Sequence, residues 1–280
     1  MSAFTPSPSS HPSPSGAADS ARSAARRASD HPALEWSARA GYVMSGVVHL
    51  LIGWLAIRIA TGSGGGEASN SGALAEIARA PGGAALLWFG VVAFVALGLW
   101  QLLEAAVGAS ETSDRVKAAA KAVVYLALAV TTATFARGGS SSDGAKSSDA
   151  TAGLLRNGAG KAVLVAVGLA IVAVGVYHVY KGVTKRFLDD LDHSGSGEVG
   201  TAIRVAGTAG YAAKGVALAV LGGLVVTAAL TADPAKASGL DAALRTLGGQ
   251  PFGAVLLVVV GAGIALYGLY SFGRARYASM

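Results

Sequence analysis

Six long apolar runs dominate the chain and limit the folds that it can adopt. They cover approximately residues 41–60, 84–103, 122–136, 162–180, 208–230 and 252–272. A helix that rises 1.5 Å per residue needs about 20 residues to cross roughly 30 Å of hydrocarbon. Five runs qualify, and the third spans only if Ala118–Ala120 extend its helix. The runs lack the period-two alternation of strands. They predict an all-α integral membrane protein built as a six-helix bundle.

Composition supports a lipid-embedded chain and excludes several kinds of chemistry. Hydrophobic residues make up 52% of the chain and charged residues 14%, whereas soluble domains carry roughly 25% charged residues. There is no cysteine, so thiolate metal sites and cysteine nucleophiles are excluded. Acidic residues lie in loops or at helix ends, and no nucleophile-elbow motif is present. We therefore expect no enzyme, no catalytic residue, no metal and no cofactor.

The basic residues predict how the chain sits in its membrane. Although the net charge is +6, Lys and Arg lie mostly at the ends of apolar runs, which argues against nucleic acid as a partner. Thirteen flanking basic residues fall on the side of the N-terminus and eight on the other side. This bias predicts a multi-pass protein of the bacterial plasma (inner) membrane with both termini cytoplasmic. The lipid bilayer is the expected partner, and the sequence does not identify a protein partner or a homo-oligomer.

One unit recurs along the chain. GYVMSGVVHLLIGWLAI at residues 41–57 matches GYAAKGVALAVLGGLVV at residues 210–226 at six of seventeen positions. The second apolar run of each unit carries a related segment, namely LGLWQLLE, VGVYHVYK and YGLYSFGR. We expect three tandem helical hairpins in a pseudo-threefold arrangement, with short amphipathic surface helices between the two helices of each hairpin. The predicted parts are a disordered Ser/Pro/Arg-rich cytoplasmic tail at 1–38 and hairpin repeats at 39–110, 111–193 and 194–280, the last with a short basic tail.

Small residues occupy one face of the first helix in each unit, with Ala118, Ala122 and Ala129 in the second. Gly46 and Gly53 in the first unit correspond to Gly215 and Gly222 in the third. Small side chains let helix backbones approach closely, which is a main route to helix association in lipid. We therefore predict that these four glycines are helix-packing residues.

The motif GY..(S/K)GV at residues 41–47 and 210–216, with the linker KRFLDDLDHSG after the fourth run, resembles a known family. This is the bacterial membrane family called domain of unknown function 1206, and the resemblance covers about residues 39–277. It implies six transmembrane helices and supplies no activity, catalytic residue or ligand. The second unit departs from the motif, with Ala118 and Ala122 at the Tyr and Gly positions.

Equivalent positions near the ends of the second helices suggest two layers of side chains. The first is a possible central polar layer of Gln101, His178 and Ser271, and the second, one turn on, is a possible cytoplasmic charged layer of Glu104, Lys181 and Arg274. On a central axis these layers would line a solute pathway. Helix ends that meet water would carry similar residues, because cations suit helix C-termini.

Ionisable groups inside the apolar runs are functional hypotheses by default. His49 and His178 could hold a haem, but their expected depths differ, so haem-binding electron transfer is only a remote alternative. We expect His178 to be neutral and hydrogen-bonded to another helix. Lys121 and Lys214 occupy the position of Ser45 and could pair with Glu104. We expect both instead to snorkel to the interface.

Two functions follow from this reading. The favoured one is a non-catalytic structural or partner-binding module. The alternative is a carrier or channel for a small solute through a central pathway. A hydrated cavity bounded by Gln101, His178 and Ser271 would favour transport, whereas a closely packed Gly/Ala centre would favour the structural module.

Overall fold

The computed structural model describes residues 32–63, 66–108, 112–191 and 197–277, and within these ranges the chain is helical and contains no strand. Most of the predicted tail, 1–31, lies outside the described residues. Residues 32–38 were expected to belong to that tail, but they form the start of the first long helix.

Six long helices in the part of the chain that the structure describes confirm the predicted all-α class. They are α2 (Pro32–Ala60), α4 (Gly83–Leu103), α5 (Thr112–Ala136), α7 (Gly158–Val183), α8 (Gly197–Thr231) and α10 (Gly253–Tyr277). Each contains a segment that is long and apolar enough to cross a membrane. The short third run gains its length as expected, because Ala118–Ala120 are part of α5. Large apolar side chains such as Val92, Val123 and Leu230 are about two-thirds exposed or more, as suits a surface surrounded by lipid.

A short helix follows the first long helix of each repeat. These are α3 (Asn70–Arg79), α6 (Asp143–Leu154) and α9 (Gly239–Gly248). The side chain of Ser69 caps α3 by accepting from the Gly72 N–H, and Ser142 caps α6 in the same way. A π-helical turn at Glu104–Gly108 ends α4, and 3₁₀ turns occur at Arg186–Asp190 and Pro234–Ala237.

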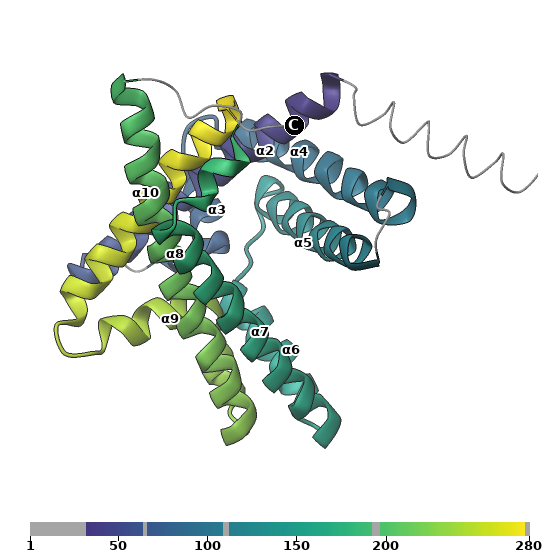
Figure 1. Ribbon diagram of the computed structural model, residues 1–280. Coiled ribbons are helices and arrows are strands. Elements are labelled where there is room, and N and C mark those ends of the chain that lie inside the picture. The colour runs from purple at the N-terminus through teal and green to yellow at the C-terminus, as the bar shows by residue number, and fades with distance from the viewer. Residues whose placement is uncertain (1–31, 64–65, 109–111, 192–196, 278–280) are drawn as a thin grey trace, which may run out of the picture.

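The closest helix pairs join one repeat to the next. They are α4 with α5, α7 with α8, and α10 with α2 (Figure 1). In each pair the second long helix of one repeat packs against the first long helix of the following repeat, and α10 completes the series by returning to α2. The helices of one predicted hairpin pack less closely, as α2 and α4 do. The repeats are therefore interlinked through these pairs.

The three pairs share one antiparallel crossing. A Cβ added at Gly268 would lie 2.9 Å from the backbone nitrogen of Leu50, and one added at Gly175 would lie 2.7 Å from that of Ala219. At Gly98 the equivalent distance, to the nitrogen of Leu126, is 3.5 Å. Leu50, Ala219 and Leu126 each lie four residues after Gly46, Gly215 and Ala122. The crossing is thus widest where alanine replaces glycine.

The predicted packing glycines lie at these crossings. Gly46 and Gly53 of α2 contact α10, and Gly215 and Gly222 of α8 contact α7. A Cβ at Gly222 would lie 2.6 Å from the carbonyl oxygen of Gly168, closer than real Cβ atoms approach. At these points only glycine allows the observed distance between backbones.

Candidate functional site

A cavity of about 390 Å³ lies inside the bundle. Its described lining residues come from α2, α3, α4, α5, α8 and α10, and none comes from α7. Asn70 and Leu74 of α3 lie at one end. At the other end the lining reaches Gly41 and Tyr42, in the first turn of the span that begins at Arg39. The cavity therefore extends from the short helix α3 toward the side of the bundle that carries the beginning of α2 and the end of α10.

His49 and Lys214 form a polar contact between α2 and α8 on the cavity wall. The Nζ atom of Lys214 lies 3.2 Å from Nε2 of His49, and Nδ1 of His49 lies 2.7 Å from the carbonyl oxygen of Ser45. A carbonyl can only accept a hydrogen bond and an ammonium group can only donate one. These partners therefore require a neutral imidazole that carries its proton on Nδ1.

Lys214 corrects one expectation. It was expected to extend to the membrane interface, but its ammonium group lies within the bundle, 4.1 Å from the ring centroid of Tyr267. The nearby Nε2 of His49 and the ring of Tyr267 provide the polar and cation–π contacts that hold it there. Lys121, at the equivalent position of α5, is exposed.

A second cation, Arg274 of α10, lines the cavity near its other end. Its Nη2 atom donates to the hydroxyl of Tyr42 at 3.0 Å, and its guanidinium lies over the same ring. The Nε atom of Arg274 is buried and has no hydrogen-bond partner among the described residues. The described lining contains no carboxylate. The cavity thus holds two cations without an acidic neighbour in its wall.

The structure separates the members of the predicted polar layer. Gln101 and Ser271 line the cavity, and the Ser271 hydroxyl donates to the carbonyl oxygen of Tyr267. His178 lies on α7, outside the described lining. Its Nδ1 lies 2.8 Å from the carbonyl oxygen of Val174 in its own helix, and its contact with α8 is a ring contact, 5.5 Å from the centroid of Tyr211. The observed bond lies within α7, where one across helices was expected.

The predicted charged layer is also dispersed. Glu104 lies in the π-helical turn after α4. Lys181 forms a 2.7 Å ion pair with Asp190, in the turn that follows α7. Of the three residues, Arg274 is the one that lines the cavity. Glu104 and Lys181 lie at helix ends, which is where the second interpretation of this layer, helix ends that meet water, would place them.

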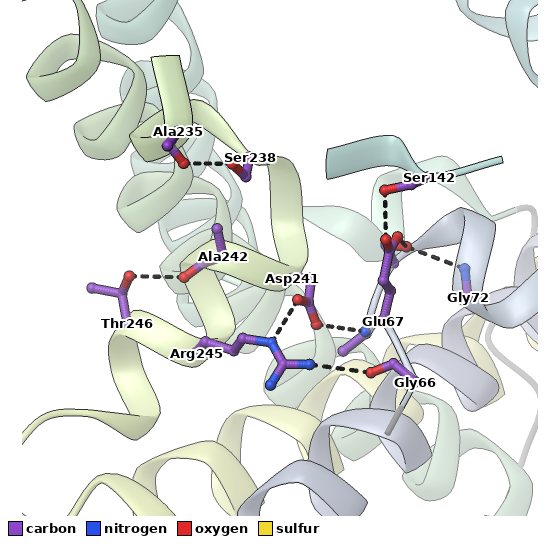
Figure 2. A network of polar contacts seen from close by, with 12 residues as sticks. Gly66, Glu67, Gly72, Ser142, Ala235, Ser238, Asp241, Ala242, Arg245 and Thr246 are labelled. Carbon is purple, nitrogen blue, oxygen red and sulfur yellow. Dashed lines mark hydrogen bonds and ion pairs between the residues drawn. The ribbon is translucent and has the colours of Figure 1, made fainter. Parts of the chain in front are cut away.

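A polar network links the segments around the three short helices at the α3 end of the cavity (Figure 2). Ser142 donates to a Glu67 carboxylate oxygen at 2.5 Å, and Asp143 accepts from both the N–H and the hydroxyl of Ser71. Asp241 accepts from the Ala68 N–H at 2.8 Å and pairs with Arg245. All three repeats contribute, so this network ties them together on one side. We call it the loop network.

Sequence reasoning missed the loop network and the roles of Tyr42 and Tyr267. The signal for the network was an acidic residue, Glu67, Asp143 or Asp241, in the Ser/Gly-rich loop of each repeat. The sequence carries a weaker signal for the residues that line the cavity. Tyr42 belongs to the repeated motif, but the motif does not tell which helix it faces.

Within the described residues, six helices of spanning length, joined by loops and built from a threefold repeated unit, define a multi-pass helical membrane protein. The family model described as Domain of Unknown Function (DUF1206) matches residues 40–108, 116–185 and 209–278, and the chain belongs to this family. The chain is also similar to the uncharacterized protein YxxB of Bacillus subtilis (strain 168), with 30% identity over 251 residues, 86% of this chain and 90% of the relative. No solved structure matches. The resemblance expected from the sequence is thereby confirmed.

Proposed function

We propose that this protein carries a small solute across the bacterial plasma membrane through the cavity between its repeats. The proposed role involves no catalytic step and no cofactor, and it places both termini in the cytoplasm. The observation that carries the proposal is the cavity itself, which is lined by ionisable and polar groups inside a bundle of membrane-spanning helices.

The cost of these groups supports a functional reason for them. A charged side chain at the centre of a spanning helix costs roughly 2.5–3.5 kcal/mol on insertion scales, and such residues mark substrate or ion pathways. The helix crossings at Gly46, Gly175 and Gly268 already hold the bundle together by close packing. Lys214, within its span, and Arg274, in the last turn of α10, do not form these crossings. A ligand would account for the place of both cations on the cavity wall.

The two ends of the cavity suggest how a carrier could work. Near Tyr42 and Gln101 the lining reaches the helix ends on the side of the termini. At the α3 end, the loop network joins all three repeats. In this proposal the cavity is open to the cytoplasm, and passage to the other side requires the loop network to open.

Water access to the cavity tests the proposal. Because the chain has no cysteine, a single introduced thiol reports on one site. Ser45→Cys lies on the cavity wall, and Ala56→Cys lies in the same helix but is fully buried and does not line the cavity. With the full chain in liposomes, the neutral reagent methyl methanethiosulfonate should label Ser45→Cys quickly and Ala56→Cys slowly. Equal, slow labelling would contradict the proposal. A solute-flux screen on the same liposomes then tests transport directly.

The second candidate is a structural module without catalysis, and the close glycine crossings favour it. Its partner would contact the outer surface of the bundle, so the cavity would have no need for water. This candidate therefore expects slow labelling at both positions and no solute flux.

A further inference from the structure

We infer that the solute of this cavity is a small organic anion bearing a carboxylate or phosphate group, an inference that rests on the proposed carrier function. Lys214 and Arg274 place two cationic groups on the cavity wall, from two different helices. The described wall offers no carboxylate to balance them. A bound anion would supply the missing negative charge.

Two ion pairs elsewhere in the described chain show a different arrangement. Lys181, whose side chain is 17% exposed, pairs with Asp190 at 2.7 Å, and Arg245 pairs with Asp241 at 2.6 Å. Lys214 instead has a neutral imidazole and an aromatic face as its neighbours, and Arg274 has a phenol. These neutral partners orient the two cations without cancelling their charge.

The hydrogen-bonding groups of the cavity also suit an anion. Arg274 has a buried Nε–H without a partner. The Tyr42 hydroxyl accepts from Arg274, so its own proton is free for another acceptor. Gln101 and Asn70 add amide N–H donors to the lining. Carboxylates and phosphates are the acceptors that guanidinium groups bind best, because the fork of donors matches their oxygens.

The size of the cavity further limits the kind of solute that it can hold. At about 390 Å³ it lies within the range of roughly 300–1,000 Å³ typical of small-molecule sites. The wall also has apolar parts, such as Leu97, Phe94 and Trp100. A metabolite-sized organic anion, with a charged head near the two cations and a carbon skeleton against these side chains, fits this wall better than a bare inorganic ion.

The charge selectivity of thiol labelling tests the inference. In liposomes, Ser45→Cys is treated separately with anionic sulfonatoethyl methanethiosulfonate and cationic trimethylammonioethyl methanethiosulfonate. Gln250→Cys, at an exposed position outside the cavity, corrects for the intrinsic rates of the two reagents. We expect the corrected rate to favour the anionic reagent by about tenfold or more, because a charged cleft concentrates counter-ions by roughly 10–10³.

Variants of Lys214 and Arg274 test whether these two residues cause the preference for the anionic reagent. Lys214→Gln and Arg274→Gln, each combined with Ser45→Cys, should lower the anion preference, and Lys214→Arg and Arg274→Lys should keep it. The conservative pair also shows whether a loss comes from charge or from misfolding. A preference that persists in both Gln variants would overturn the assignment to these residues.

The remaining outcomes separate this inference from the proposed function. If the neutral reagent labels Ser45→Cys but the anionic reagent has no advantage over the cationic one, the anion inference is wrong and the water-filled cavity stands. If none of the three reagents labels Ser45→Cys faster than Ala56→Cys, the carrier proposal itself is wrong.

Discussion

The ammonium group of Lys214 in α8 lies 3.2 Å from Nε2 of His49 in α2, so the third repeat places a cation against a neutral imidazole of the first. Replacing Lys214 with methionine would remove a buried charge and keep most of the side-chain volume. A charge inside a spanning helix costs roughly 2.5–3.5 kcal/mol on insertion scales, which offsets the loss of about 1–3 kcal/mol when Nε2 of His49 is left without a donor.

Lys214→Met should therefore leave the thermal unfolding midpoint in detergent unchanged or raise it, and should lower the anion preference at Ser45→Cys. Lys121→Met, at the equivalent exposed position of α5, is the matched control and should change neither property. A large loss of stability in Lys214→Met alone would show that this lysine serves the fold.

Gly222 and the neighbouring Gly223 of α8 offer a matched test of the helix crossings. A Cβ at Gly222 would lie 2.6 Å from the Gly168 carbonyl oxygen, whereas a Cβ at Gly223 meets nothing within 4 Å. Gly222→Leu should lower the free energy of unfolding by about 1–3 kcal/mol or more, because α7 and α8 must move apart. Gly223→Leu should have little effect. Similar midpoints for the two variants, measured by thermal unfolding in detergent, would refute the crossing.

The loop network can be tested at Asp143. This carboxylate accepts two hydrogen bonds from Ser71, whose side chain is almost fully buried. Asp143→Ala would leave those donors without a partner, at a cost of about 1–3 kcal/mol. Asp149→Ala, at an exposed position of the same helix, should cost much less. If thermal unfolding gives the same small loss for both, the network contributes little to joining the repeats.

The proposed topology makes a separate prediction. Arg39 of α2 donates to the carbonyl oxygens of Ala275 and Arg276 near the end of α10. The beginning of α2 and the end of α10 therefore lie on the same side of the bundle. The bias of thirteen to eight flanking basic residues places that side in the cytoplasm. A reporter enzyme that is active only outside the cytoplasm should be inactive when fused after Met280 and active when inserted after Gly249. The reverse pattern would invert the orientation and place the open end of the cavity outside.

His178 should tolerate substitution. Its ring nitrogen bonds within its own helix and its ring lies against Tyr211, so no other helix depends on its hydrogen bond. His178→Gln should cost less than about 1 kcal/mol, in the range of single polar contacts in membranes, and expression should be nearly unchanged. A haem absorption band in the purified protein that disappears in this variant would instead support the electron-transfer alternative.

The sequence was sufficient for the six helices because span length is a local property of each apolar run. The choice of partners is not local. The three units resemble one another, so a pattern such as Gly46 and Gly53 predicts a close crossing but not whether α4 or α10 supplies the other side. Lys214 shows the same limit: its place near the start of an apolar run suggested the interface, and the contact that holds it inside comes from His49, 165 residues earlier.

The pairing of α10 with α2 also has a consequence for how the chain is made. Ribosomes synthesise a chain from its N-terminus, so α2 reaches the membrane before the other spanning helices of the described residues, and α10 reaches it after them. Each of the other two close pairs joins helices that are consecutive long helices in the chain and can assemble as soon as both have been inserted. Helix α2 must wait for α10, with Gly46 and Gly53 uncovered in the meantime. A chain that stops before α10 would therefore present a ready-made glycine face to quality-control proteases, or to the α10 of another copy.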